Sequence, residues 1–313
     1  MSEIGIVIVT YNSQSEIGPC LDAALSTGAD IVVVDNASRD GTLAEVTRRG
    51  VHVIANAENR GFAAAVNQGF RELHSPYVLL LNPDAVILGG LDAMRRACDA
   101  EGAAGAGGCL VDARGSPQVG FMVRSFPTPA ALALEVLVLN RIWPKNPVNR
   151  RYRSVALDYS SQIAVEQPAG AFLMLRRAVW EELGGFDEGY YPLWFEDVDF
   201  CRRVAAHNYV LFYTPDAVAR HTGGHSLASI SVQIRSFYWY RSLLRYSARH
   251  FHPLAFRMMC LAVVAGSILR GVAGALFQGS WQPMKACGSV TRLAGRCLLS
   301  GWKDAGVMYG SRF

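Results

Sequence analysis

Residues 4 to 12 read Ile-Gly-Ile-Val-Ile-Val-Thr-Tyr-Asn, and residues 31 to 36 read Ile-Val-Val-Val-Asp-Asn. Both stretches are short β-branched runs that end in polar side chains, and amphipathic segments separate them from later runs of the same kind. The runs predict strands over residues 6–9, 31–34, 51–54 and 77–81. Because continuous apolar strands are typical of a sheet covered on both faces, we expect parallel βαβ units and an α/β fold.

Polar residues follow three of these predicted strands directly. They are Thr10-Tyr11-Asn12, Asp35-Asn36 and Asn82-Pro83-Asp84. In an open α/β sheet, ligands bind at the edge formed by the carboxyl ends of the strands. The three polar breaks therefore predict one crevice at that edge.

Two carboxylates in the predicted crevice have specific uses. Asp35 can accept the imide N–H of uracil or thymine and so select a pyrimidine base. The alternative for Asp35 is a turn aspartate that caps the following helix. Asp84 follows Pro83, which fixes the backbone, and suits one direct bond to Mg²⁺ or Mn²⁺. The alternative for Asp84 is a plain Asn-Pro-Asp turn.

The remainder of the first 226 residues gives weaker patterns. Thr42 and Glu45 are spaced as a capping box at a helix start. The Gly/Ala-rich residues 102–108 are interpreted as a helix-to-strand turn, and residues 116–166 as long loops with one apolar helix near 130–140. Beyond them we expect a strand over 171–175, a helix over 177–183 and a helical segment over 194–207.

Three acidic residues, Glu196, Asp197 and Asp199, lie within four positions of one another beside aromatic residues. At about 100° per residue on a helix, Asp197 and Asp199 point about 200° apart and cannot serve the same atom. Asp199 precedes Arg203 by four residues and is expected to pair with it. Asp197, in the first helical turn, is the better candidate for a general base. The alternative is a solvated acidic helix start that the helix dipole favours.

The chain contains neither G-x-x-x-x-G-K-[ST] nor a G-x-G-x-x-G after its first strand, which excludes a P-loop enzyme and a standard dinucleotide-binding protein. Its motifs instead resemble glycosyltransferase family 2, in particular the bacterial rhamnosyltransferase-like branch, whose metal motif is often N-P-D. The resemblance covers roughly residues 4–226. The motifs occur in the expected order as Thr10-Tyr11-Asn12, Val34 to Thr42, Asn59 to Asn67 and Leu81 to Asp84.

This resemblance implies a GT-A fold, a mostly parallel sheet with helices on both faces, in a catalytic domain over residues 1–226. It also implies that Asp197, the second acid of an E-D motif, deprotonates the acceptor hydroxyl. The segment from His221 to Ser226 fits the H-x-x-G-x-S element of the branch. A neutral imidazole there can complete a metal shell that Asp84 begins, so His221 is the expected ligand and His225 the second choice.

The predicted site residues follow from the strand ends and from this resemblance. Those expected to bind the nucleotide sugar are Thr10, Tyr11, Asn12, Asp35, Asn59, Arg60, Gly61, Asn67 and Asn82. Asp84 and His221 are expected to bind a divalent cation, Mg²⁺ or Mn²⁺. Trp194 and Glu196 are expected to contact the acceptor, with Asp197 as the base.

The predicted reaction is an inverting, metal-dependent sugar transfer in cell-surface polysaccharide synthesis. The resemblance implies dTDP-L-rhamnose as donor, with UDP sugars as the alternative, and a glycan or polyprenyl-linked acceptor. A nucleotidyltransferase would need a Gly-rich basic loop after the first strand, where this chain has Thr10-Tyr11-Asn12-Ser13. A non-catalytic sugar-nucleotide-binding scaffold protein is a further alternative, but it would have no need for the predicted base and metal ligands.

Charge divides the chain near residue 226. Residues 1–226 carry a net charge of −6, whereas residues 227–313 carry +10. Aromatic residues 237–240 and nearby arginines accompany this basic charge, so we expect a helical extension over 227–313 that contacts anionic membrane or a second subunit of a homo-oligomer. No nucleic-acid recognition motif accompanies it, and nucleic acid is not an expected partner.

Targeting and redox features are sparse. The N-terminus has no basic region before its apolar run, so no signal peptide is expected. The longest uncharged apolar run, residues 258–269, has 12 residues and is too short to span a bilayer, which predicts a cytoplasmic protein peripheral to the inner face of the membrane. The seven cysteines form no C-x-x-C pair and are expected to be reduced thiols.

Overall fold

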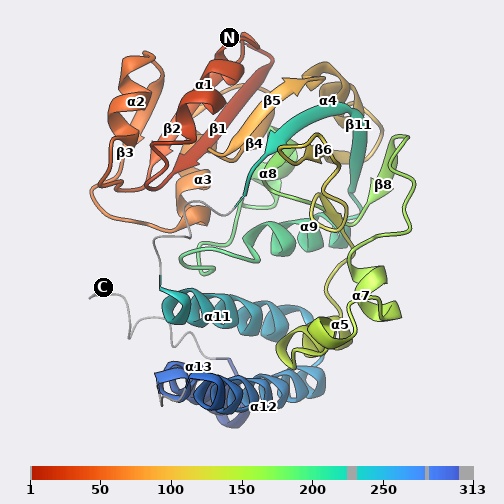
Figure 1. Cartoon of the computed structure of the whole chain (residues 1–313). Helices are drawn as coiled ribbons and strands as arrows, with labels where there is room; N and C mark the ends of the chain where they lie inside the picture. Colours follow the sequence, from red (N-terminus) through yellow and green to blue (C-terminus); the bar gives the residue numbers. More distant parts are fainter. Residues whose placement is uncertain (1, 224–230, 279–281, 303–313) are drawn as a thin grey trace. The chain divides into compact units, whose positions relative to one another are not determined.

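The computed structural model describes residues 2–223, 231–278 and 282–302, apart from the side chains of 277–278 and 282–286. The chain forms two compact units, described separately below and coloured along the sequence in Figure 1. The first unit consists of Met1–Phe126, Arg153–Pro192 and Glu196–Ser229; the second consists of Pro127–Tyr152, Leu193–Phe195 and Ile230–Phe313. The second unit thus includes two segments that precede residue 226.

A mixed sheet forms the centre of the first unit (Figure 1). Its strands are β1 Ile4–Thr10, β2 Asp30–Asp35, β3 His52–Ala55, β4 Tyr77–Leu81, β5 Ala85–Gly89, β6 Ala103–Val111, β8 Ile163–Val165, β10 Phe172–Arg176 and β11 Val210–His221. Among the described residues their order is β3-β2-β1-β4-β10-β6-β11-β5, with β8 paired to β11. Strands β1 to β4 pair in parallel, as the apolar runs predict, whereas β10 is antiparallel to β4 and β6. Two short strands, β7 Val123–Arg124 and β9 Gln167–Pro168, pair with each other.

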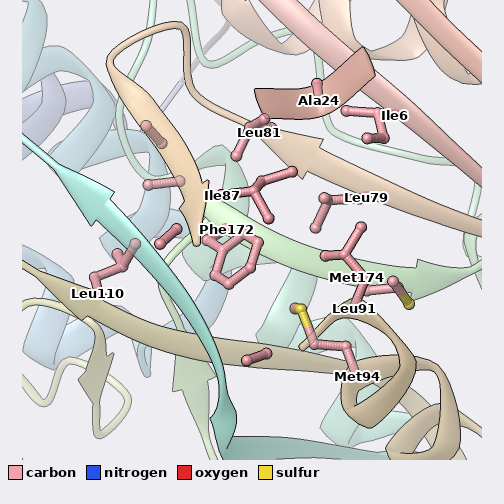
Figure 2. Packing of buried hydrophobic residues seen from close by; sticks show 14 of the residues in the cluster. Ile6, Ala24, Leu79, Leu81, Ile87, Leu91, Met94, Leu110, Phe172 and Met174 are labelled. Atoms are coloured by element: carbon pink, nitrogen blue, oxygen red, sulfur yellow. The ribbon is translucent and has the colours of Figure 1, made fainter. Parts of the chain in front are cut away.

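Helices cover both faces of this sheet. They are α1 Ile17–Leu25, α2 Thr42–Arg48, α3 Phe62–Glu72, α4 Leu91–Cys98, α8 Arg177–Glu182 and α9 Glu196–Ala206. Because side chains alternate along a strand, Ile6 joins the cluster under α1, α2 and α4, which Figure 2 shows, while Val7 joins the cluster under α3, α8 and α9. The predicted α/β fold with helices on both faces is confirmed.

The Gly/Ala-rich segment forms the buried strand β6, so the prediction of a turn over residues 102–108 is wrong. A Cβ at Gly105 would lie 2.3 Å from the backbone oxygen of Met174, and one at Gly108 would lie 2.4 Å from the ring of Phe172. Close packing against β10 therefore excludes the β-branched side chains that usually mark a strand in the sequence.

Helix α2 begins at Thr42, as expected, but the capping box does not form. Oδ1 of Asp40 accepts hydrogen bonds from the backbone N–H and the hydroxyl of Thr42, at 3.0 and 2.5 Å. Glu45 instead forms an ion pair with Arg49 at 2.6 Å. Asp40 therefore supplies the acceptor for the first turn, and Thr42 Oγ1 is left to accept the N–H of Ser13 at 2.7 Å.

The described part of the second unit is helical, which confirms the predicted C-terminal helical region. Its helices are α5 Pro129–Val136, α6 Leu139–Ile142, α7 Pro147–Tyr152, α11 Val232–His250, α12 Pro253–Gln278 and α13 Gln282–Ser300. Helix α12 packs against α5, α11 and α13. Its approach to α5 requires Gly266, because a Cβ there would lie 2.1 Å from the backbone oxygen of Val136. Arg270 of α12 also donates to the backbone oxygen of Glu135 at 3.0 Å.

Helix α12 is longer than the uncharged run inside it. Within the described residues, Pro253–Leu276 is 24 residues long with a mean hydropathy of 1.9, long and apolar enough to cross a membrane by length and composition alone. Arg257 and Arg270 bound the run in the sequence without ending the helix, so the helix passes a test of length and composition that the 12-residue run alone does not. One third of the tested window, 33%, is buried against protein, and core helices of soluble proteins pass the same test.

Candidate active site

The carboxyl ends of β1 and β2 bring Thr10 and Asp35 together. The two buried residues are register partners, and Thr10 Oγ1 donates to Asp35 Oδ1 at 2.9 Å. Ser38 adds a hydroxyl bond to Oδ1 at 2.6 Å and a backbone N–H bond to Oδ2 at 3.1 Å. A carboxylate has about four acceptor positions, two on each oxygen. Asp35 is thus a turn aspartate that keeps one acceptor position on Oδ2.

The turns after β1 and β2 are tied to each other by hydrogen bonds. Asn12 has a left-handed φ of 50°; its N–H donates to Ser38 Oγ at 2.8 Å, and its Oδ1 accepts the N–H of Arg39 at 2.8 Å. The N–H of Tyr11 donates to Ser13 Oγ at 3.4 Å. Tyr11 and Asn12 therefore lie beside the Asp35 turn, as the strand-end argument predicts.

Asn36 holds the segment 59–61 against the end of β2. Its Nδ2 donates to Asn59 Oδ1 at 2.9 Å, and its Oδ1 accepts the N–H of Arg60 at 2.9 Å. Gly61 has φ 85°, and a Cβ there would lie 2.9 Å from the ring of Tyr191. No role was predicted for Asn36 from the sequence, although it is the second polar residue after a buried strand. The structure gathers Asn59, Arg60 and Gly61 at this edge through it.

Asn67 lies within α3, and its amide is engaged by the protein itself. Its Nδ2 donates to the backbone oxygen of Phe186 at 2.9 Å and to Glu188 Oε1 at 3.0 Å, and its Oδ1 accepts the N–H of Phe186 at 3.0 Å. This set of bonds holds the 186–188 loop. Asn67 thus differs from the other residues predicted to bind the donor, because its contacts stabilise a loop.

Asp84 and His221 meet where β5 begins and β11 ends. Ala85 is the register partner of His221, and the N–H of Thr222 donates to the backbone oxygen of Asp84 at 3.2 Å. His221 Nε2 lies 3.5 Å from Asp84 Oδ1, with 5% and 10% of the two side chains exposed. Asn82, directly after β4, is anchored by its N–H to the backbone oxygen of Ala171 at 3.0 Å.

This pair fits a divalent cation that takes its other ligands from phosphate or water. One carboxylate oxygen and one imidazole nitrogen lie close enough to bind the same ion, and both are shielded by protein. Among the described residues, no group of three or more His, Cys, Asp or Glu side chains is arranged to hold a metal ion, so Asp84 and His221 are the candidate pair. His225, the second choice, lies outside the described residues.

A segment without any recognised motif completes the surroundings of His221. Gln118 contacts the imidazole Nδ1 through Oε1 at 3.1 Å, and Phe121 stacks on the ring with centroids 5.0 Å apart and planes 12° apart. Arg124 lies over the Phe121 ring, 5.8 Å from its centroid, and its charge acts on Asp197. Residues 118–124 thus connect the Asp84–His221 pair to the predicted base. No local sequence pattern predicts these contacts, because Gln118 is 103 positions from His221 in the chain.

Asp197 lies in the first turn of α9 and is partly buried. Its Oδ1 accepts the N–H of Val198 at 2.8 Å, and its Oδ2 accepts the N–H of Gly170 at 3.2 Å. Burial raises the pKa of Asp197 above its ordinary value, while these N–H groups and the charge of Arg124 oppose the rise. A carboxylate with a raised pKa is the better proton acceptor, which agrees with the predicted role.

Glu196 precedes it and has a different environment. The side chain is buried, and its Oε2 has no hydrogen-bond partner within the described structure. Burial, and then the negative charge of Asp197, raises the pKa of Glu196 well above its ordinary value. This shift favours the neutral, protonated form of Glu196.

Asp199 forms the predicted pair with Arg203, and the pair is buried. Arg203 Nε donates to Asp199 Oδ2 at 2.9 Å, and Tyr190 donates to Oδ1 at 3.2 Å. The same guanidinium donates to the backbone oxygens of Leu183 and Gly185, each at 2.6 Å. This network braces the turn that ends α8, so Asp199 has a structural use.

Trp194 belongs to the second unit, together with Phe195. Both residues have left-handed φ angles, 77° and 72°, which are unfavourable for bulky side chains. Phe195 packs against Tyr246 and Trp239 of α11, with ring centroids 5.4 and 6.2 Å apart. Helix α9 accordingly begins at Glu196, two residues after the predicted start of the helical segment.

The fold and this site together define a class: an α/β protein whose polar residues gather at the carboxyl ends of parallel strands, the edge where open α/β sheets bind ligands. A family comparison makes the class specific. Residues 5–183 match the family model "Glycosyl transferase family 2". The chain belongs to that family and is a glycosyltransferase.

Two relatives are rhamnosyltransferases. The chain is 29% identical over 280 residues to N-acetylglucosaminyl-diphospho-decaprenol L-rhamnosyltransferase of Mycobacterium tuberculosis, a match that covers 78% of this chain and 88% of the relative. It is 27% identical over 195 residues to rhamnosyltransferase WbbL of Escherichia coli, covering 61% of this chain and 69% of the relative. The predicted likeness to a rhamnosyltransferase branch is confirmed.

Solved structures share the fold at low sequence identity. One is the mannosyltransferase PcManGT from Pyrobaculum calidifontis in complex with GDP-Man and Mn²⁺, with a TM-score of 0.54, 15% identity and coverage of 96% of this chain and 88% of that chain. Another is S. aureus TarS 1-349 in complex with UDP-GlcNAc, with a TM-score of 0.53, 17% identity and coverage of 95% and 82%. These likenesses support the GT-A-type fold.

Proposed function

We propose that this glycosyltransferase transfers L-rhamnose from dTDP-L-rhamnose, with inversion, to a hydroxyl of a lipid-linked glycan acceptor. The observation that carries the proposal is that residues 118–124 link a partly exposed carboxylate, Asp197, to a shielded Asp84–His221 pair. The names of the two rhamnosyltransferase relatives favour the sugar, and the decaprenol of the mycobacterial enzyme favours a polyprenyl-linked acceptor.

The donor's base is assigned to the Asp35 turn. The free acceptor position on Asp35 Oδ2 suits the imide N–H of thymine or uracil, which purines do not present in the same place. Thr10 and Ser38 hold the carboxylate in place by donating to Oδ1. Asp35 thus selects a pyrimidine but does not separate dTDP from UDP, so UDP sugars stay the alternative donors.

Asp197 is assigned the proton transfer. As the acceptor oxygen forms its bond to the anomeric carbon, the bond from that carbon to the donor's diphosphate oxygen breaks, and Asp197 takes the hydroxyl proton. Attack from the face opposite the leaving group inverts the anomeric centre in a single displacement. No covalent enzyme intermediate is needed. Glu196 is proposed to contact the acceptor.

The diphosphate is assigned to the Asp84–His221 end of the site. A divalent cation bound there, Mg²⁺ or Mn²⁺, would neutralise negative charge on the departing diphosphate. Asp84 would supply a carboxylate oxygen and His221 would supply Nε2, and both side chains are largely shielded from solvent. Tyr11, Asn12, Asn59, Arg60, Gly61 and Asn82 are proposed to line the rest of the donor site.

The second unit is proposed to attach the enzyme to the inner face of the cytoplasmic membrane. One side of α12 exposes apolar residues at helical spacing: Leu254, Met258, Leu261, Ile268, Leu269, Val272 and Leu276. The net charge of +10 over residues 227–313 favours an anionic leaflet, at about 1 kcal/mol for each basic residue near it. A second copy of the chain is the alternative occupant of this surface.

A donor panel tests the proposed reaction. The purified protein is incubated with dTDP-L-rhamnose, UDP-glucose, UDP-N-acetylglucosamine or GDP-mannose and a polyprenyl-diphosphate glycan, with and without EDTA, and nucleoside diphosphate release is measured. We expect release from dTDP-L-rhamnose that EDTA abolishes. Release from a UDP sugar and not from dTDP-L-rhamnose would show that the donor is a UDP sugar. Undiminished release in EDTA would refute the role of the cation.

A further inference from the structure

Gln118 makes two hydrogen bonds to a single residue, His221. Its Nε2 lies 2.7 Å from the backbone oxygen of His221, and its Oε1 lies 3.1 Å from the imidazole Nδ1. The Gln118 backbone is itself anchored, because its N–H donates to the backbone oxygen of Leu110 at 2.8 Å. The amide therefore grips both the main chain and the ring of His221 from a fixed position.

These two contacts determine which ring nitrogen of His221 carries the proton. A backbone carbonyl oxygen only accepts hydrogen bonds, so the NH₂ group of Gln118 must face it. The amide oxygen is then the atom that faces Nδ1, and an oxygen acceptor requires a proton on that nitrogen. In the neutral ring Nε2 is consequently left with its lone pair.

That lone pair points toward a carboxylate. His221 Nε2 is 3.5 Å from Asp84 Oδ1, and both side chains are largely shielded from water. Without the Gln118 contacts, the Asp84 carboxylate would favour the opposite tautomer of His221, in which Nε2 carries the proton and donates to the carboxylate. In the Nδ1–H tautomer, His221 Nε2 and Asp84 Oδ1 are both electron-rich and lie close together, which suits a cation bound between them.

Phe121 restricts the remaining freedom of the ring. Its stacking on the imidazole, with planes 12° apart, opposes rotation that would carry Nδ1 away from Gln118. Gln118 and Phe121 come from the same short segment, so this segment fixes both the plane of the ring and its tautomer.

We propose that Gln118 is a positioning residue that holds His221 in the Nδ1–H tautomer and so presents Nε2, beside Asp84, as a ligand for a divalent cation. The inference rests on the cation in the proposed function. It adds a residue of the 118–124 segment that acts through its two hydrogen bonds to His221.

Two substitutions separate this role from a merely structural one. Gln118→Glu keeps an oxygen that can accept from Nδ1 but loses the donor to the backbone oxygen, whereas Gln118→Met has similar length and offers neither bond. Val119→Ala is the matched control, since Val119 is an exposed neighbour in the same segment. A structural role predicts equal damage in both Gln118 variants, whereas the positioning role predicts that Glu preserves the tautomer.

The tautomer is measured directly on the metal-free protein by long-range ¹H–¹⁵N correlation with ¹⁵N-labelled histidine, above the ordinary histidine pKa of about 6.5. The His221 signals are those missing from His221→Ala. We expect the proton on Nδ1 in the wild type, in Gln118→Glu and in Val119→Ala, and a shift of the proton to Nε2 in Gln118→Met. A wild-type ring protonated on Nε2 overturns the proposal.

Cation binding is measured by titrating Mn²⁺ into each protein in the presence of dTDP, followed by electron paramagnetic resonance. Gln118→Met should weaken the apparent Mn²⁺ affinity by about 10- to 100-fold, and Gln118→Glu by no more than a few-fold. Wild-type affinity in Gln118→Met, or no Mn²⁺ binding by the wild type, overturns the proposal. Mn²⁺ binding that responds to Gln118 in a protein that transfers no sugar supports the positioning role and refutes the proposed reaction alone.

Discussion

Replacing Asp197 by Asn removes the proposed base while retaining the size of the side chain. The Asn oxygen can still accept from one of two backbone donors, Val198 N–H at 2.8 Å or Gly170 N–H at 3.2 Å. Its NH₂ group must then face the other N–H, which leaves a donor without an acceptor and costs about 1–3 kcal/mol of stability. Because a domain of ordinary stability has about 5–15 kcal/mol, the variant should remain folded.

The increase in the activation free energy of transfer caused by Asp197→Asn should exceed its cost in the free energy of unfolding. An amide does not take the acceptor's proton, and losing a general base lowers the rate by about 10² to 10⁴. That range corresponds to about 2.7–5.4 kcal/mol in the barrier. Donor binding should stay within a few-fold of wild type, because Asp35 and Asp84 are unchanged. The assay is nucleoside diphosphate release at saturating donor and acceptor, normalised to the folded fraction from circular dichroism.

Asp199→Asn is the matched control, since it makes the same change two positions along α9. It weakens a buried ion pair with Arg203, and breaking such pairs costs about 3–5 kcal/mol, so it should lower stability more than Asp197→Asn does. Transfer per folded molecule should nevertheless stay close to wild type. Substantial transfer by the Asp197 variant, with Glu196→Gln inactive, would show that the neighbouring acid is the base.

Three further predictions concern the cation, the buried acid and the membrane. Asp84→Ala and His221→Ala should each weaken Mn²⁺-dependent binding of dTDP about tenfold or more, measured by calorimetry. Asp35→Ala should instead reduce the preference for dTDP over GDP. Loss of Mn²⁺ binding in His225→Ala but not in His221→Ala would show that His225 is the ligand. Burial and the Asp197 charge raise the pKa of Glu196, so the native state binds more protons than the unfolded state and the free energy of unfolding should fall as pH rises above about 4.3. Glu196→Gln should remove this fall between about pH 5 and pH 8, measured by denaturant unfolding. The same fall in the variant would contradict the assignment. Leu261→Glu should weaken binding to anionic vesicles by about 10- to 150-fold, from about 1.5–3 kcal/mol of lost apolar contact, measured by cosedimentation. Sedimentation of the wild type should weaken at high salt. Equal sedimentation with neutral vesicles, or none by a stable oligomer, would assign the surface to a second subunit.

The parallel part of the fold could be predicted because burial on both faces leaves a direct trace in the sequence. The predicted strand at 77–81 has the observed bounds, and that at 31–34 lies inside the observed 30–35. Strand β6 left no such trace, since its neighbours leave no room for a Cβ at Gly105 or Gly108. Residues at strand ends could be placed at one edge for the same topological reason. Contacts made across the fold, such as Gln118 with His221, have no local pattern and needed the structure.

Helix α9 shows how environment, more than residue type, selects one acid from three. Arg203 and Tyr190 satisfy Asp199, so it has no free role in proton transfer. Glu196 is buried, its Oε2 has no hydrogen-bond partner among the described residues, and its pKa is raised well above its ordinary value, which favours its neutral form.

Asp197 is partly exposed, and it is the carboxylate proposed to take the acceptor's proton. Burial raises its pKa, and two backbone N–H groups and the charge of Arg124 limit the rise. Arg124 belongs to the segment that also holds His221, so the same seven residues, 118–124, affect both the proposed base and the proposed cation ligand. A deletion or insertion in this segment should therefore impair cation binding and proton transfer together, whereas substitutions at Asp84 or Asp197 should separate them.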